Sequence, residues 1–416
     1  MLEKLKESKA AAADYMADGI THVIKSFKKR APGSEGEREA QEYMKSELEK
    51  YSDSTALEEF KLNPGSFYGW IYFTVTAGII SLAVYFFAPL IALALLIVAL
   101  IPMVSQFVLY RQVFDPLFKE ATSCNVTAIK KPAGAVKRRI IFCGHADAAN
   151  EWPINYYLGG KAFSFTFVVL MLGILYLTSI YIAALAIDGI AAKMPVLGTT
   201  TIMGLAGLAF LPFFIALYFF SNKKVVVDGA NDNLTACYLS IALLKYLADN
   251  GITPENTEVG VLITGSEEAG LRGAKAWAAA HKDEYRDVPT FFVAYDTIAD
   301  LDCLYINNKD LNGLVPTDKD VNALLMEASD NTAAGATFNK VTVGSTDSAA
   351  FTQAGLKSAC ITGADHSLKP YYHTRRDSYE LINKEALSKV FELSAEAIRL
   401  VDSGKYDSAS VKAVTK

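Results

Sequence analysis

Three long stretches without charge constrain this chain more than any other feature. No Asp, Glu, Lys or Arg occurs within residues 62–110, 162–187 or 194–222. Because a helix needs roughly 20 apolar residues to cross a bilayer, these stretches predict four transmembrane spans, near 68–87, 90–110, 163–187 and 200–220. The alternative is a set of helices buried in a large soluble core, but runs of this length favour the membrane.

The four predicted spans form two hairpins. Pro89 lies between the first two spans, where a tight turn would fall. Each hairpin returns the chain to the side from which it came, so all of the polar sequence lies on one face of the membrane. Aromatic residues stand near the span ends, as in the aromatic belts of membrane proteins: Tyr68, Trp70, Tyr110 and Tyr218.

Basic residues predict the orientation in the membrane. On the side of the polar sequence the spans are flanked by Arg111, Lys119, Lys161, Lys223 and Lys224. The loop of the second hairpin offers only Lys193, with Asp188. The positive-inside rule then places the polar bulk in the cytoplasm. The first residues are charged and amphipathic, so we expect no signal peptide there, and 5 cysteines without regular spacing fit a reducing compartment.

The polar sequence predicts an α/β domain with one central sheet and helices on both faces. Helical periodicity indicates helices at 36–50, 231–249, 270–282, 319–330 and 384–402. Apolar runs indicate strands at 55–62, 123–130, 138–143, 257–264, 289–295, 338–343 and 357–362. We expect the strands 123–130 and 138–143 to be neighbours, since the short segment KKPAGAVKRR joins them.

The domain organisation follows from these two patterns. We predict one discontinuous domain made of residues 1–61, 111–161 and 223–402, with a tail at 403–416. The hairpins 62–110 and 162–222 are inserted into it. The net charge of −5 and the scattered basic residues exclude nucleic acid as a partner.

Histidine and carboxylate side chains follow several of the predicted strands. His145 and Asp147 come after strand 138–143, Glu267 and Glu268 after strand 257–264, and Asp296 ends the segment FFVAYD. Asp232 stands at the start of a helix, and His373 lies in a late loop. Because ligands bind at the carboxyl edge of open α/β sheets, the set is typical of a metal site.

Each of these residues also has a purely structural interpretation. A lone histidine at a strand end is more often a hydrogen-bonded structural residue, Asp232 could cap a helix, and Asp296 could close a turn. Glu267 and Glu268 could simply favour a helix dipole. His366 is close enough to His373 in sequence to be a rival ligand. The structural interpretations do not explain why five separate elements carry such residues.

Five motifs, taken in their order along the chain, resemble those of the co-catalytic di-zinc aminopeptidase and glutamate carboxypeptidase family. They are GHADA, GANDN, EEAGLRGAKAW, VAYDTIAD and YHTRRD. The segment RAPGSEGEREAQEYMKSEL also resembles the opening helix of that family. The resemblance covers nearly all of the polar sequence. The four spans have no counterpart in the soluble members, which leaves substrate and access open.

The resemblance implies a site for two zinc ions. Asp232 would bridge the ions, with His145 and Asp296 on one and Glu268 and His373 on the other. Asp147 would hold the second ring nitrogen of His145, and Asp377 would do the same near His373.

The resemblance also implies catalytic roles beside the metals. Glu267 matches the general base. Tyr372 is a candidate donor to the oxyanion, and a packed aromatic role is the alternative. The segment from Gly344 to Phe351 resembles the substrate-pocket segment of the family.

The sequence therefore predicts a membrane-embedded di-zinc exopeptidase, an aminopeptidase first of all. A carboxypeptidase or a non-peptide amidohydrolase is the alternative, since Arg375 and Arg376 could bind a substrate carboxylate. A non-catalytic receptor of this fold would have lost ligands, and a transporter would carry ionisable residues in its spans. Because His145 and Asp232 flank the second hairpin, we hypothesise that the active site faces the bilayer and that substrates are membrane-associated or apolar peptides. Spans that serve only as an anchor are the alternative, and the oligomeric state stays open.

Overall fold

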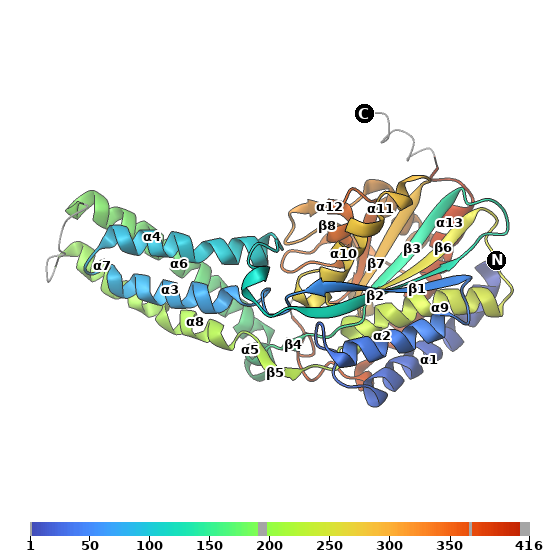
Figure 1. The fold of residues 1–416 in the computed structure, drawn as a ribbon, viewed down its shortest axis with the longest axis horizontal. Helices are drawn as coiled ribbons and strands as arrows, with labels where there is room; N and C mark the ends of the chain where they lie inside the picture. The colour runs from blue at the N-terminus through green and yellow to red at the C-terminus, as the bar shows by residue number, and fades with distance from the viewer. Residues whose placement is uncertain (1, 190–197, 366–367, 408–416) are drawn as a thin grey trace.

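A computed structural model of the chain describes residues 2–189, 198–365 and 368–407. These residues form a sheet domain and an elongated helix bundle that projects from one end of the sheet (Figure 1). The expected α/β class, a mixed sheet flanked by helices, is confirmed.

The sheet has nine strands in the part of the chain that the structure describes. They are β1 (Ser54–Leu62), β2 (Ala121–Lys130), β3 (Arg138–His145), β6 (Thr257–Thr264), β7 (Thr290–Ile298), β8 (Leu304–Asp310), β9 (Val315–Pro316), β10 (Thr337–Lys340) and β11 (Ser358–Gly363). Their order is β1-β2-β6-β3-β7-β11-β8-β10, and β9 pairs with β8. The central strands β6, β3, β7 and β11 are mutually parallel, so their carboxyl ends meet at one edge of the sheet.

Helices cover both faces of the sheet because its strands alternate between two cores. In β3, Ile140 and Phe142 belong to one apolar core, whereas Ile141 and Cys143 belong to the other. The first core is closed by α1 (Leu2–Ser26), α2 (Glu35–Leu48), α9 (Thr235–Asp249), α11 (Lys319–Thr332) and α13 (Lys384–Asp402). The second is closed by α10 (Arg272–His281), α12 (Asp347–Gln353) and the base of the bundle.

The expected neighbourhood of strands 123–130 and 138–143 is wrong. β6 lies between β2 and β3, antiparallel to the first and parallel to the second. The connecting segment crosses the start of β6, where Ala133, Gly134 and Lys137 donate backbone hydrogen bonds to the carbonyls of residues 254–256. A connection of this length therefore spans an intervening strand rather than forming a hairpin.

The bundle consists of two helical hairpins. The first contains α3 (Trp70–Val84), α4 (Pro89–Pro102) and a π-helical turn at Met103–Val108. The second contains α5 (Pro153–Leu158), α6 (Gly160–Asp188), α7 (Thr199–Gly207) and α8 (Leu211–Ala216). Its root is closed by a small ladder between β4 (Asn150–Glu151) and β5 (Asn222–Val226).

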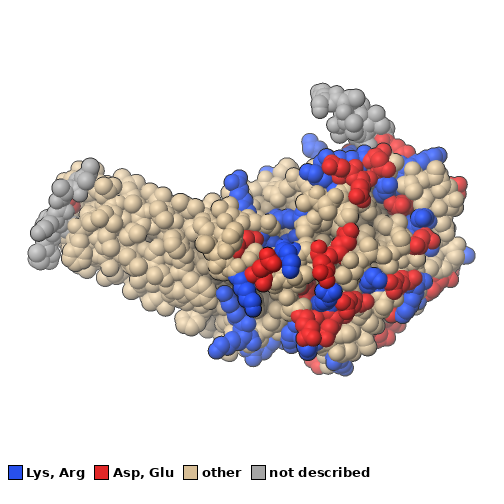
Figure 2. Space-filling view, viewed as in Figure 1, with Lys and Arg blue, Asp and Glu red and all other residues tan. Residues whose placement is uncertain are grey.

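Three helical segments among the described residues are long and apolar enough to cross a membrane: Pro89–Val108, Gly160–Asp188 and Thr199–Phe219. The first expected span, 68–87, contains α3, which has only 15 residues because turns precede Trp70 and the helix ends before the Pro89 turn. On the face shown in Figure 2, the described bundle surface carries hardly any charged side chains, and basic side chains gather where it meets the sheet domain.

The predicted tail divides into two parts. After α13, Asp407 pairs with Arg138 through two hydrogen bonds of 2.8 and 2.6 Å. Residues 403–407 thus pack on the sheet domain, and residues 408–416 lie outside the described residues.

Candidate active site

The predicted site residues converge at the carboxyl edge of the parallel strands. His145 is the last residue of β3, and Asp296 lies near the end of β7. Glu267 and Glu268 form a short 3-10 turn (Glu267–Ala269) after β6. Asp232 lies in the turn Ala230–Leu234 that leads into α9, and His373 is in the loop after β11. Five of these six side chains are at least nine-tenths buried. The side chain of Asp296 is partly exposed toward a cavity.

Asp232 lies at the centre of this group. Its Oδ1 is 3.3 Å from Nε2 of His145, and its Oδ2 is 3.0 Å from Nε2 of His373. Nε2 of His373 is also 3.2 Å from Oε1 of Glu268. Ligand atoms of His145, Asp232 and Glu268 all lie within 4.8 Å of one another. The two oxygens of one carboxylate thus face two different imidazoles.

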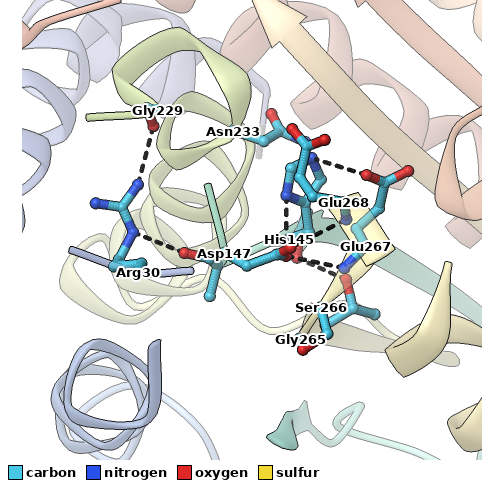
Figure 3. A network of polar contacts seen from close by, with 12 residues as sticks. Arg30, His145, Asp147, Gly229, Asn233, Gly265, Ser266, Glu267 and Glu268 are labelled. Atoms are coloured by element: carbon cyan, nitrogen blue, oxygen red, sulfur yellow. Dashed lines mark hydrogen bonds and ion pairs between the residues drawn. The ribbon is translucent and has the colours of Figure 1, made fainter. Parts of the chain in front are cut away.

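Asp147 connects the histidine to the glutamate turn (Figure 3). Its Oδ1 lies 3.3 Å from Nδ1 of His145. The same carboxylate accepts the backbone N–H groups of Glu267 at 2.9 Å and of Glu268 at 3.0 Å. Asp147 is fully buried, so a single side chain lies against the His145 ring and holds the backbone of the two glutamates.

The backbone around the two glutamates turns their side chains apart. Ser266 and Gly270, on either side of the turn, have positive φ angles of 55° and 97°. Oε2 of Glu267 lies 3.8 Å from Nε2 of His145, whereas Glu268 faces His373. Two adjacent carboxylates therefore reach different parts of the site.

Burial and mutual charge shift the protonation of the cluster. Burial raises the pKa of Glu267 well above the usual glutamate value, although His145 partly offsets the effect. Burial, and then the charge of Asp232, raise the pKa of Asp296 to about 8. For His373, burial disfavours the cation, but Glu268 and Asp232 outweigh it and raise the pKa to about 10. The cluster holds more carboxylates than imidazoles, so the positive charge of its histidines does not balance the negative charge of its carboxylates.

A cavity of about 300 Å³ opens beside these groups. Asp232, Glu267, Glu268, Asp296 and His373 form its polar floor. Segment 341–346 lines one side of the cavity. The predicted pocket segment therefore reaches the cavity with its first three residues, which begin at Gly344. Tyr372 also lines it, with its ring stacked on His373 at 4.2 Å between centroids.

Several supporting residues escaped the sequence interpretation. The buried carboxylate of Glu37 in α2 accepts the hydroxyl of Ser266 at 3.0 Å and the N–H of Gly33 at 2.7 Å. Buried Arg30 donates to the carbonyls of Ala146 and Gly229, at 2.7 and 3.1 Å. Both residues lie in the segment that resembles the opening helix of the family, which was the available signal.

Two minor expectations have different outcomes in the structure. Asp377 does not hold the ring of His373. Its carboxylate accepts the backbone N–H groups of Asn231 and Asp232 instead, at 2.9 and 3.1 Å, because the loop after His373 folds under the Asp232 turn. The rival ligand His366 lies outside the described residues.

Arg375 has a partner of its own. It forms two 2.6 Å hydrogen bonds with the buried carboxylate of Glu151 in β4. Arg375 and Arg376 both lie over the ring of Tyr156, and neither lines the cavity.

The fold resembles solved zinc aminopeptidases over nearly its whole length. An aminopeptidase from Aneurinibacillus sp. strain AM-1 matches with a TM-score of 0.58 and 14% identity, over 96% of both chains. A zinc aminopeptidase from Bacillus subtilis, BSAP, matches with a TM-score of 0.55 and 14% identity, over 94% of both chains. A glutaminyl cyclase from an Acidobacteriales bacterium matches with a TM-score of 0.54 and 15% identity, over 94% of both chains. No curated protein matches the sequence.

The fold is therefore the one found in solved aminopeptidases. Residues 218–398 match the model of Peptidase family M28. Within these residues the match agrees with the family resemblance stated from the motifs.

Proposed function

We propose that this chain is a membrane-embedded di-zinc aminopeptidase. The observation that carries the proposal is the position of Asp232, whose two carboxylate oxygens face His145 and His373 separately, at 3.3 and 3.0 Å. A bridging carboxylate requires this arrangement, with one oxygen for each of two ions. His145 and Asp296 would complete the protein ligands of one ion, and Glu268 and His373 those of the other.

The residues present fit zinc. Nε2 of His373 lies 3.0 Å from Oδ2 of Asp232 and 3.2 Å from Oε1 of Glu268, and both oxygens are buried without a hydrogen bond. One ring nitrogen carries at most one proton and cannot satisfy both oxygens. A cation held among the three atoms would satisfy them. Imidazole and carboxylate are ligands that zinc prefers.

Glu267 is the proposed general base. When bound, zinc supplies a Lewis acid that polarises the scissile carbonyl and lowers the pKa of the attacking water. Glu267 borders the cavity and is turned away from His373. Its carboxylate would take the proton of that water and deliver it to the leaving amine. Its raised pKa suits a group that both accepts and returns a proton.

Tyr372 and Asp147 support this step without taking the proton. Burial, followed by the charges of Asp232 and Asp296, raises the pKa of Tyr372, so its hydroxyl stays protonated and can donate to the developing oxyanion. Asp147 would hold the His145 ring in one orientation and the base in position, through the contacts to His145, Glu267 and Glu268.

The charge of the cavity supports an aminopeptidase over a carboxypeptidase. No Lys or Arg is among the described residues that line the cavity, and Arg375 is already paired with Glu151. A substrate carboxylate would therefore find no basic side chain, whereas a free α-ammonium group suits a cavity floored by carboxylates. A carboxypeptidase or a non-peptide amidohydrolase remains the alternative.

The bundle supports integral membrane attachment with the sheet domain in the cytoplasm. Its three long apolar segments satisfy the length of a membrane span. The basic residues beside the spans, Arg111, Lys161, Lys223 and Lys224 among them, are exposed on the side of the sheet domain, as the positive-inside rule requires.

Hydrolysis by the purified full chain in detergent tests this function. The panel contains aminoacyl amides, matched N-blocked peptides and a peptide with an N-terminal glutamine. We expect hydrolysis of free N-termini only, loss of activity with a chelator and its return with zinc. Glu267→Gln should lose roughly 10²- to 10⁴-fold in kcat while it retains zinc. Undiminished hydrolysis by that variant would overturn the assigned base, and cleavage of blocked peptides would overturn the aminopeptidase assignment.

A further inference from the structure

The inserted hairpins form much of the cavity wall. Five aromatic residues of the hairpins line the same cavity as Glu267 and Asp232. They are Phe67 and Tyr68 before α3, Phe107 in the π-helical turn, and Phe163 and Phe167 on α6. Trp152 and Phe220, at the two roots of the second hairpin, line it as well. Apart from the catalytic cluster, Asp365 is the one charged residue among the described lining residues. The floor of the cavity is polar and its wall is aromatic.

This wall extends into the membrane-spanning part of α6. Lys161 is exposed and is the last charged residue before the span. Val168 still lines the cavity, seven residues further on, which corresponds to about 10 Å along a helix. The cavity therefore extends about 10 Å along α6 beyond the last charged residue that flanks the predicted span.

The rim of the cavity is exposed and apolar. Val168 on α6 is 57% exposed and Val343 in segment 341–346 is 68% exposed, although both line the cavity. Segment 341–346 is tied to the end of the first hairpin through Asn312, which accepts the N–H of Gly344 at 2.9 Å and donates to the carbonyl of Val108 at 3.0 Å. The rim thus lies beside the bundle.

We propose that the cavity opens sideways to the bilayer, between α6 and segment 341–346, and admits peptides whose apolar N-terminal residues reside in the membrane. The proposal rests on the proposed aminopeptidase function and names the substrate class of that site. The aromatic wall receives the apolar side chain of the N-terminal residue. The carboxylate floor receives the α-ammonium group, and the scissile bond lies over the catalytic cluster.

Contacts from the wall to a proposed metal ligand support one continuous site. Phe163 of α6 stacks on Trp152, with 4.7 Å between centroids and 2° between planes. The Trp152 ring packs on the ring of His373 at 4.3 Å between centroids, and the backbone N–H of Trp152 donates to the His373 carbonyl at 2.8 Å. The first turn of a membrane helix is thus two contacts away from the catalytic group. An anchor alone would need no such contact.

The test compares two peptides in vesicles that contain the full chain. Both carry the same apolar N-terminal residues and the same single transmembrane segment. In one peptide a short spacer keeps the scissile bond at the membrane surface, and in the other a long hydrophilic spacer places it in water. Both peptides have the same concentration in the membrane, so enrichment there cannot favour either. We expect at least ten-fold higher kcat/KM for the short spacer. Equal rates, or faster cleavage of the long-spacer peptide, would overturn lateral entry.

Two pairs of variants locate the entry. Val343→Asp should reduce the short-spacer preference at least ten-fold, whereas Ala135→Asp, in the exposed turn at the opposite end of β3, should leave it unchanged. Phe167→Ala should lower kcat/KM for an N-terminal leucine roughly ten- to hundred-fold and leave an N-terminal alanine nearly unaffected. Phe165→Ala is its control, since Phe165 is 61% exposed on the same helix and does not line the cavity. Equal effects within either pair would contradict the proposal.

A soluble aminoacyl amide separates this inference from the proposed function. If wild type cleaves the amide in a zinc-dependent manner but shows no short-spacer preference, only lateral entry fails. If it cleaves neither the amide nor the peptides, the aminopeptidase function itself fails, and the inference falls with it.

Discussion

The sheet domain and the bundle differ in how far their apolar side chains are buried. In the sheet domain most of them are enclosed, and β11 is buried along its whole length. In the bundle, only 28%, 39% and 22% of an apolar 18-residue stretch in each of the three long segments is buried. Large exposed apolar residues such as Phe165, Leu175 and Phe219 lie on its surface. This exposed apolar surface fits the proposed membrane attachment, because soluble proteins rarely expose large apolar patches to water.

The two regions nevertheless share one core. One apolar cluster contains residues of both regions. It includes Phe292 and Leu262 of the sheet, Trp277 of α10, and Val75 and Leu177 of the bundle. A flexible tether would not produce this continuity. The hairpins are therefore packed against the sheet domain rather than tethered to it, and the following experiments test how far that packing matters.

The largest expected effect comes from the buried ion pair at the first hairpin. Asp115, after the hairpin, contacts Arg272 of α10 at 2.8 and 3.0 Å, and Arg272 is 3% exposed. Asp115→Ala leaves this charge buried without a partner and should destabilise the fold by about 3–5 kcal/mol, measured by denaturation in detergent. The double variant with Arg272→Met should lose much less. A loss below about 1 kcal/mol for the single variant would indicate that the regions are only tethered.

The next effect should be confined to the sheet domain. Asp147→Asn places an amide where the carboxylate accepts the N–H groups of Glu267 and Glu268. We expect zinc affinity to fall about ten- to hundred-fold, measured by competition with a chelator, with membrane insertion unchanged. Asp14→Asn, at an exposed ion pair with Lys384, serves as the control. Equal zinc affinity in both variants would contradict the assigned role of Asp147.

A smaller effect should couple the two regions across Trp152. In a double-mutant cycle, Trp152→Leu and Phe163→Leu should show a coupling energy of about 0.5–1.5 kcal/mol, as expected for one stacked aromatic pair. The same coupling should be visible in kcat/KM, since Trp152 also packs on His373. Additive losses would show that α6 does not communicate with the site.

The smallest effect should be a pH dependence at the same junction. Lys275 of α10 donates to the carbonyls of Tyr110, at the end of the first hairpin, and of Gly270. Burial, and then Arg272, lower its pKa to about 7. Between this value and the unfolded value near 10.5 the unfolded chain binds more protons, so this group makes stability rise with pH over that window. Lys275→Met should flatten the rise in denaturation midpoints, and an unchanged slope would contradict the assignment.

The residues brought together in the site could be predicted because their order in the sequence is specific. His145, Asp232, Glu268, Asp296 and His373 follow separate elements, and the parallel strands bring their ends to one edge. Their roles as ligands stay a prediction that metal analysis must test. The supporting contacts could not be predicted, since Glu37 reaches Ser266 across 229 residues. Asp377 shows the same limit, since an aspartate that accepts backbone N–H groups looks like one that orients a histidine ring in the sequence.

Strand order escaped sequence interpretation for a related reason. β8, with the sequence LYINNKD, buries Leu304 and Ile306 but ends in polar residues, so its periodicity is too short to detect. The position of β6 between β2 and β3 depends on which core each strand completes. Such choices are made by packing between distant segments, and no local pattern records them.

The depth of the cavity rim in a bilayer tests most directly whether the catalytic cavity and the membrane bundle form one unit. Nitroxide labels at Val343 and at Ala135 would be compared in full-length protein in vesicles, with the partly exposed Cys303 replaced by serine. We expect the label at Val343 to be relaxed more by oxygen dissolved in lipid than by an aqueous reagent, and the label at Ala135 to show the reverse. Equal exposure of both labels to the aqueous reagent would contradict this expectation.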